Sequence, residues 1–227
     1  MTDALNADFS RRVVMQTGAM DWQPSPSPTV WRKRLDLVGP AEQGRVTSVV
    51  RYDPGSRFPS HDHPAGEEIL VLDGVFSDEH GHYAVGTYLL NPQGFRHAPF
   101  SEQGCRLFVK LCQYAGAGRK HVLRDTAAMP WSSGSVSGIS HKELFDGATI
   151  GDGTTECARL VRFAPGARTP DHDHPLSEEI FVVEGAVEDQ FGRYETGTWV
   201  RYPAHSRHSA YSAVGCVLYV KSGHLPA

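Results

Sequence analysis

The sequence predicts an all-β protein whose chain contains two tandem barrels, one in each half. Three observations lead to this fold class: an internal repeat, short apolar runs separated by turn residues, and abundant Gly and Pro. The 227 residues include 23 Gly and 15 Pro without a collagen-like period, which favours many turns and short strands. Outside the short runs, no window of 12 or more residues has a 3.6-residue apolar period, so long helices are not expected.

The repeat is visible when the chain is compared with itself. Residues 51–110 align with residues 162–221 at a constant offset of 111, and 28 of the 60 positions are identical. Unrelated stretches would share roughly three or four residues on ordinary usage. A weaker match at an offset of 109 pairs Trp22 with Trp131 and Leu35 with Leu144. Each copy has the size of a domain, and we predict domains at 1–117 and 118–227.

Each copy is predicted to consist of short strands. The apolar runs of the first copy are RVTSVVRY, EEILVLDGVF, GTYLL and CRLFVKL, and clusters of Gly, Pro, Asn or Asp separate them. Such runs are typical of strands. In EEILVLDG, Ile69 and Val71 lie on one face and Leu70 and Leu72 on the other, so both faces are apolar, as expected inside a barrel or sandwich.

Composition and charge exclude several classes of function. The 22 basic and 26 acidic residues give a net charge of −4, which does not favour nucleic acid or an anionic membrane as a partner. No run of 18 apolar residues occurs, and the N-terminus lacks the apolar core of an export signal, so we expect a cytoplasmic protein. The four cysteines are far apart, which predicts reduced thiols. Cys105 and Cys216 occupy matched positions, either as redox-responsive thiols or as buried small residues.

One set of four residues recurs in both copies and has the chemistry of a metal site. His61 and His63 are two apart on a predicted strand, so their rings share a face. Glu67 and His97 follow in the first copy. The second copy has the same spacing, with His172, His174, Glu178 and His208. Three imidazoles and a carboxylate suit a divalent transition metal such as Zn, Fe or Mn and disfavour Mg and Ca. We therefore predict two metal ions per chain.

These residues form motifs that resemble those of the cupin superfamily. The first motif reads Gly55-x5-His61-x-His63-x3-Glu67-x6-Gly74 and recurs as Gly166-x5-His172-x-His174-x3-Glu178-x6-Gly185, and the second reads Gly86-x5-Pro92-x-Gly94-x2-His97. The chain thus resembles a bicupin, and its strands are most similar to ChrR-type cupins, which include the C-terminal domain of zinc-dependent anti-sigma factors. The resemblance implies jelly-roll barrels, with Glu67 and Glu178 as ligands and Glu68 and Glu179 as second choices.

Two departures from the family pattern affect the expected function. In the second copy His205 replaces the glycine of the Pro-x-Gly turn; it either alters a surface turn or contacts the site. The anti-sigma relatives begin with a separate zinc-binding helical domain built on His and Cys, whereas no His or Cys precedes His61 here. Binding of a sigma factor is therefore not supported.

Several further residues are candidates for a ligand pocket. Two arginine pairs recur near the metal ligands, and they either anchor an anionic or keto substrate or bond loop carbonyls. Tyr88 matches Trp199, and Arg201 replaces a leucine, which indicates either pockets of different character or core positions. The candidates are Arg57, Arg168, Arg96, Arg207, Tyr88, Trp199, Arg201 and His205. The Arg32-Lys33-Arg34 run is interpreted as an exposed strand segment.

Three functions are compatible with these sites. The chain is either a metal-dependent enzyme, by family analogy a dioxygenase acting on a small diketone-like substrate, or a non-catalytic regulatory module that senses small molecules. A third alternative has one active and one structural copy. The fusion of two copies can replace the pairing that single cupins make as dimers, and a homodimer of the whole chain is left open.

Overall fold

The computed structural model describes residues 4–40 and 42–225, and these form two compact, almost entirely β units. The first unit comprises residues 4–7 and Met20–Ala128, and the second comprises Asp8–Ala19 and the residues from Met129 on. The predicted all-β class and the two jelly-roll domains are confirmed. The predicted boundary between residues 117 and 118 stays a prediction.

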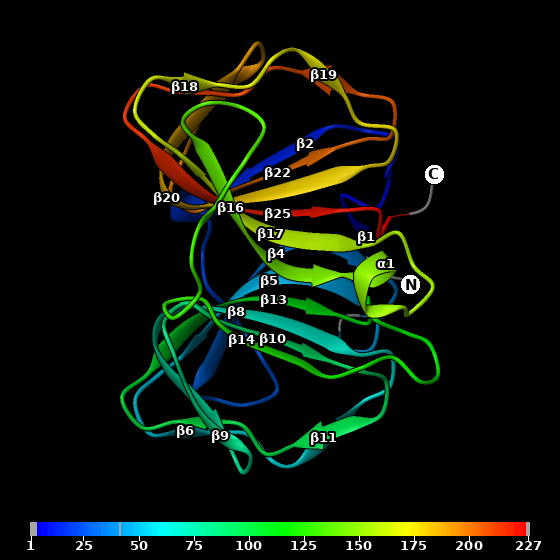
Figure 1. Ribbon diagram of the computed structural model, residues 1–227. Coiled ribbons are helices and arrows are strands. Elements are labelled where there is room, and N and C mark those ends of the chain that lie inside the picture. Colours follow the sequence, from blue (N-terminus) through cyan, green and yellow to red (C-terminus); the bar gives the residue numbers. More distant parts are fainter. Residues whose placement is uncertain (1–3, 41, 226–227) are drawn as a thin grey trace. The chain divides into compact units, whose positions relative to one another are not determined.

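The first unit is built on one large antiparallel sheet with the order β1-β4-β5-β13-β8-β10-β14. Its strands are β1 (Ala4–Leu5), β3 (Gln23–Pro24), β4 (Val30–Val38), β5 (Arg45–Tyr52), β6 (Ser56–Arg57), β7 (His61–His63), β8 (Glu67–Asp78), β9 (Gly81–Ala84), β10 (Thr87–Asn91), β11 (Phe95–His97), β12 (Phe100–Ser101), β13 (Cys105–Leu111) and β14 (Val122–Asp125). β8 also pairs with β9 and β12, and β12 pairs with β6, so these short strands continue the sheet across the unit (Figure 1). β11 pairs with β7 in a separate two-stranded sheet.

The second unit repeats this arrangement, with the order β15-β16-β17-β25-β20-β22-β2. Its elements are β2 (Val13–Gln16), the 3-10 turn η1 (Thr17–Ala19), β15 (Ser132–Ser133), β16 (Ile139–Asp146), α1 (Gly147–Ile150), β17 (Cys157–Phe163), β18 (Ala167–Arg168), β19 (His172–Asp173), β20 (Glu178–Asp189), β21 (Gly192–Glu195), β22 (Thr198–Tyr202), β23 (Arg207–His208), β24 (Tyr211–Ser212) and β25 (Cys216–Ser222). In both units the pairing path is open, so the sheets are jelly-roll-like and do not close into barrels.

The apolar core of each unit lies on the inner face of its large sheet. In the first unit Ile69 and Val71 of β8 pack with Phe76, Leu107 and Val109. Leu70, on the opposite face of β8, is 2% exposed, so this strand is buried on both faces, as its sequence predicts. No helix in the described ranges is long and apolar enough to cross a membrane.

The two sequence repeats exchange a strand. β2 precedes the first copy in the chain but pairs with β22 of the second unit, and β14 precedes the second copy but pairs with β10 of the first. In Figure 1 the blue β2 lies beside the orange β22. The registers are equivalent, because Val14 is opposite Val200 and Leu123 is opposite Leu89. We call these two strands the arms, and each arm completes the sheet that belongs to the other repeat.

Candidate metal centres

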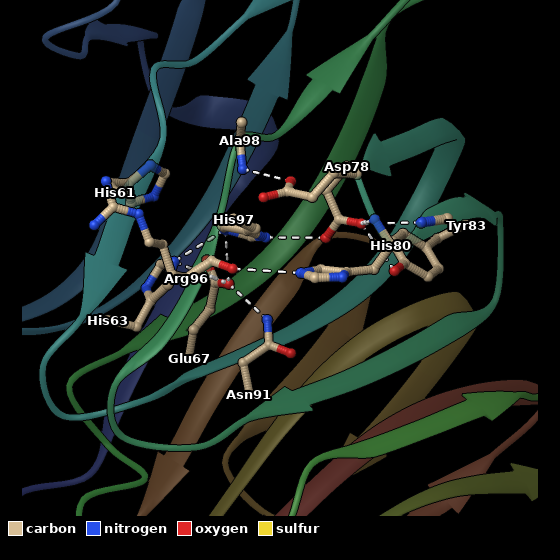
Figure 2. A network of polar contacts seen from close by, with 12 residues as sticks. His61, His63, Glu67, Asp78, His80, Tyr83, Asn91, Arg96, His97 and Ala98 are labelled. Carbon is tan, nitrogen blue, oxygen red and sulfur yellow. Dashed lines mark hydrogen bonds and ion pairs between the residues drawn. The ribbon is translucent and has the colours of Figure 1, made fainter.

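Three short strand segments bring the predicted ligands of the first unit together. β7 pairs with β11 so that His61 is opposite His97. Their rings, with that of His63, place one nitrogen each within 4.8 Å of the others. The Nε2 atoms of His63 and His97 are 3.0 Å apart. Glu67 begins β8, and its Oε2 lies 3.4 Å from Nε2 of His63 and 3.6 Å from Nε2 of His97. Figure 2 shows the carboxylate of Glu67 beside the rings of His63 and His97.

Hydrogen bonds on the outer side of the rings set which nitrogen faces the cluster. His61 Nδ1 lies 2.9 Å from the carbonyl oxygen of Pro59, and His97 Nδ1 lies 3.1 Å from Oδ2 of Asp78. A ring that donates through Nδ1 presents an unprotonated Nε2, which is the form that ligates a metal. Burial lowers the pKa of His63, which also keeps that ring neutral. The donor set therefore fits a divalent transition metal.

Asp78 is the buried residue that orients His97. Its carboxylate accepts hydrogen bonds from Tyr83 Oη at 3.0 Å and from the backbone N–H groups of His80 and Gly81. Burial opposes ionisation, but the hydrogen bonds from His97, His80 and Tyr83 lower the pKa of Asp78 below its ordinary value. Asp78 thus remains a carboxylate that can hold the Nδ1–H of His97 (Figure 2).

The second unit assembles the equivalent residues. His172 is opposite His208 in the β19–β23 pair, and with His174 they form a cluster within 4.8 Å. Oε2 of Glu178 lies 3.5 Å from Nδ1 of His174, and its Oε1 lies 4.0 Å from Nε2 of His208. His172 Nδ1 contacts the carbonyl oxygen of Pro170 at 2.9 Å. This arrangement is looser around the carboxylate than that of the first unit.

The centres differ in one residue beside the cluster. In the first unit Asn91 Nδ2 donates to Oε2 of Glu67 at 3.0 Å. Tyr202 occupies the equivalent position of the second unit, and its hydroxyl donates to Asp189 at 2.7 Å, while its ring lies 4.4 Å from that of His208. Among the described residues no amide donates a hydrogen bond to Glu178, and burial raises the pKa of Glu178 to about 7.

The cavities beside the two clusters differ in size. The first has a volume of about 390 Å³ and reaches His61, His63 and Glu67. Its walls are largely apolar and include Val50 and Leu107. The second has about 160 Å³ and reaches His172, Glu178 and His208, with Tyr202 in its wall. Each cavity belongs to one unit.

The recurring arginines lie outside both cavities. Arg57 pairs with Glu102, and Arg168 lies over the ring of Tyr211 at 4.6 Å. Arg96 contacts Asp62 at 3.4 Å, and Arg207 contacts Asp171 at 2.7 Å. Arg57, Arg96 and Arg207 are well exposed and bond acidic side chains. A substrate-binding role for these residues stays a prediction.

The remaining pocket candidates also lie outside the two cavities. Tyr88 and Trp199 are fully buried, and Tyr88 donates to Oε1 of Glu68 at 2.8 Å. Arg201 is fully buried and donates to the carbonyl oxygen of Asp8 at 2.9 Å. His205 has a φ of 63°, the conformation of the glycine it replaces, and its backbone N–H donates to the carbonyl oxygen of His174.

Sequence reasoning missed one arginine of the first cavity and one aspartate beside each histidine cluster. Arg32 lines this cavity and its side chain is 11% exposed, so its interpretation as exposed was wrong. The signal was strand alternation, because Arg32 is two residues from buried Val30. Asp78 and Asp189 were also missed, although they are among the identities between the two repeats.

Comparisons with known proteins agree with this architecture. The family described as ChrR cupin-like domain matches residues 10–115 and 119–226. No curated protein matches the chain. A protein of Nostoc punctiforme provisionally named a dioxygenase has a similar structure, with a TM-score of 0.78 and 16% identity over 94% of this chain and 82% of that one. The oxalate decarboxylase of Lactobacillus farciminis, solved as a formate complex, has a TM-score of 0.68 and 12% identity over 93% of this chain and 86% of that one. At these identities the likeness shows the fold.

Proposed function

Because this chain belongs to the ChrR cupin-like family, with one copy of the domain in each half, we propose that it is a metal-dependent enzyme acting on a small molecule in the first unit. The observation that carries the proposal is the position of the His61, His63, Glu67 and His97 cluster at the wall of a 390 Å³ cavity. A ligand in this cavity would have direct access to a metal held by these four side chains.

The residues of the first unit have distinct roles in this proposal. A divalent metal bound there would polarise oxygen donors of the substrate and, as iron, would support dioxygen chemistry. Asp78 fixes the ring of His97, and Asn91 fixes the carboxylate of Glu67. The apolar walls exclude water around the substrate, which strengthens the electrostatic interactions inside the cavity.

The reaction class we propose is that of a dioxygenase acting on a small diketone-like substrate. The donor set supports it, because oxygen-activating iron sites are characteristically built from two histidines and a carboxylate, and this cluster contains such a set with one further imidazole. The name given to the Nostoc punctiforme protein points in the same direction. The oxalate decarboxylase shares the same fold, so decarboxylation of a small acid is the competing chemistry.

For the second unit we propose a metal with a mainly structural role. Its cavity has 160 Å³, and Tyr202 occupies the position from which Asn91 supports Glu67 in the first unit. This observation also favours the alternative for the whole protein, a non-catalytic regulatory module in which closed metal sites stabilise the fold.

The decisive experiment combines metal analysis with a matched pair of variants. Elemental analysis and X-ray absorption of the protein purified without added metal should give two ions per chain, with bound water at the first site. His97→Ala and His208→Ala should each leave one ion. Oxygen uptake with a panel of diketones should be abolished in His97→Ala and retained in His208→Ala. Two tetrahedral zinc ions without turnover would support the regulatory alternative, and a metal-free protein would contradict both.

A further inference from the structure

The cavity of the first unit has a second polar end, distinct from the histidine cluster. We propose that Arg32, assisted by Ser48, binds the carboxylate of an acidic substrate whose apolar body fills the cavity and whose other end reaches the metal. This inference rests on the proposed function and deepens it, because it assigns the chemical class of the ligand. It adds a specificity-determining residue, Arg32, that the metal motifs do not contain.

The polar end is part of the inner face of the large sheet. On β4, Val30, Arg32 and Arg34 are each two residues apart, so their side chains lie on the same face of the strand. Val30 belongs to the core, so this face is the inner one. The β4–β5 register places Arg32 opposite Val50 and Arg34 opposite Ser48. Arg32, Ser48 and Val50 line the same cavity as His61, His63 and Glu67. A single ligand can therefore contact both ends.

A carboxylate already bridges the two guanidinium groups. Oε2 of Glu42 lies 2.7 Å from Nη2 of Arg32, and its Oε1 lies 3.2 Å from Nη2 of Arg34. The arginine side chains are 11% and 15% exposed, whereas that of Glu42 is 47% exposed. Glu42 shows that this pair of cations accepts a carboxylate from the rim of the cavity. A guanidinium has five N–H donors, so Arg32 can bind a second carboxylate beside that of Glu42.

Ser48 supplies a neutral donor beside this charge. Ser48 is 3% exposed and lines the cavity, and its hydroxyl has no hydrogen-bond partner among the described residues. An unpaired buried hydroxyl is unfavourable. An oxygen of a bound carboxylate would accept this hydrogen bond and remove the cost. The hydroxyl therefore points to a ligand independently of the arginines.

The space between the two polar ends is apolar. Its walls are formed by Val46, Val50, Ile69, Leu107 and Val109, among others. Such a surface favours a hydrocarbon ligand, because it offers no hydrogen-bond partner to the polar groups of a ligand. The geometry thus assigns a ligand with a metal-binding head, an apolar body and a terminal carboxylate.

The second unit lacks the equivalent group, which makes it an internal comparison. The repeat alignment replaces Arg32 by His141, Arg34 by Glu143 and Ser48 by Arg159. Glu143 is opposite Arg159 in the β16–β17 pair, so the cation has an acidic neighbour on the next strand. None of these residues lines the 160 Å³ cavity. Carboxylate recognition is therefore a property of the first unit.

The test uses two series of hydroxamic acids, whose heads chelate metals. One series ends in a carboxylate: succinic, adipic and suberic monohydroxamic acid. The other has the same lengths without the carboxylate: butano-, hexano- and octanohydroxamic acid. Calorimetric titration of the metal-loaded full chain should show the acid of the best length binding about tenfold tighter or more than its neutral partner, because charge-assisted hydrogen bonds are strong.

Four variants assign this preference to the proposed residues. Arg32→Met should abolish it without weakening the neutral probe, and Arg32→Lys should retain only part of it, since Lys lacks the planar fork. Ser48→Ala should reduce the preference a few-fold. Glu42→Gln should increase it, because the competing carboxylate is removed. Arg106→Met, at an exposed arginine of the same unit outside the cavity, is the matched control and should change nothing.

The same titrations on chelator-treated protein separate the two proposals. If removing the metal leaves every Kd unchanged, the proposed metal centre is contradicted, while the ratio of acid to neutral probe still decides the carboxylate site. Equal binding of the two series at every length, a preference that survives in Arg32→Met, or no binding of any probe would overturn the carboxylate site. A preference lost in Arg32→Met and raised in Glu42→Gln would support it.

Discussion

Asn91 and Tyr202 occupy the same position in the two repeats, yet their side chains serve different carboxylates. Asn91 donates to Glu67, which belongs to the histidine cluster, whereas Tyr202 donates to Asp189 behind it. Partners that orient a metal ligand influence metal affinity strongly. A single difference between the copies therefore changes the surroundings of two clusters that are built from the same residue types.

This difference predicts the effect of Asn91→Leu, a change of similar volume that removes the amide donor. We expect the metal affinity of the first site to fall about 10–100-fold, as for other outer partners of metal ligands. The measurement is competition with a chromophoric chelator in a His208→Ala background, where one metal per chain remains. An unchanged affinity would show that Glu67 is not positioned through Asn91.

A second prediction concerns Cys105, which is 4% exposed. Burial raises the pKa of its thiol to about 11. Because only the thiolate reacts, about one thiol in a thousand is reactive at pH 8, and this fraction rises roughly tenfold per pH unit until the pKa is reached. Mass spectrometry after iodoacetamide treatment should show labelling of Cys105 in urea but not in the native protein at pH 8. Rapid native labelling would revive a redox role for this residue.

The predicted ligands that the structure brings together are those that recur in both repeats. His61, His63 and His97 recur as a set, and the structure brings each set together. Arg32 was missed because it has no counterpart in the second copy, where His141 stands, and because a charged strand residue is usually exposed. A residue that has a role in only one unit cannot be found by comparing the two sequence repeats.

At the scale of elements, β8 and β20 each contain a register shift, which lies between Val71 and Asp73 in β8 and between Val182 and Glu184 in β20. Gly74 directly follows this shift in β8, opposite Cys105, with a φ of 71°. A Cβ atom there would lie 2.2 Å from the carbonyl oxygen of Gly104. Gly185 repeats the arrangement, with a distance of 2.1 Å from the carbonyl oxygen of Gly215. Backbone cannot move aside as a side chain can, so both positions require glycine.

We expect Gly74→Ala to destabilise the first unit by more than about 3 kcal/mol, because a backbone clash adds to the cost of a positive φ. Gly55→Ala is the matched control: its φ is 76°, but no atom lies within 4 Å of the added Cβ. The control should cost only about 1 kcal/mol. Urea unfolding measures both changes, and equal losses would contradict the argument.

The long strands were predictable and the arms were not. β8 and β13 combine apolar runs with flanking turns, a pattern that indicates strands. β2 and β14 have four residues each. β2 alternates between half-buried and exposed residues, and β14 is largely exposed, so neither pattern indicates with which strand it pairs. Their partners lie far away in sequence, so strand pairing across the repeats depends on the folded sheet and on hydrogen bonds that a sequence pattern does not encode.

At the scale of the whole chain, the exchanged arms predict the result of cutting the connection between the repeats. Residues 115–118 are mostly exposed, and Gly118 has free space around it, so a protease recognition site inserted there should be tolerated. After cleavage the two fragments should still elute together in size-exclusion chromatography, because β2 pairs with β22 and β14 with β10. Separation of the fragments under native conditions would contradict this expectation.

The exchange of arms also affects how the folded fraction depends on protein concentration. A protein with one such repeat could complete its sheet only by recruiting another molecule, so its folded fraction would fall on dilution. In this chain the second repeat is always present on the same polypeptide, at an effective concentration that the linker sets and dilution does not change. The completed sheets, and the histidine clusters that they hold, are therefore expected to persist however little of the protein a cell contains.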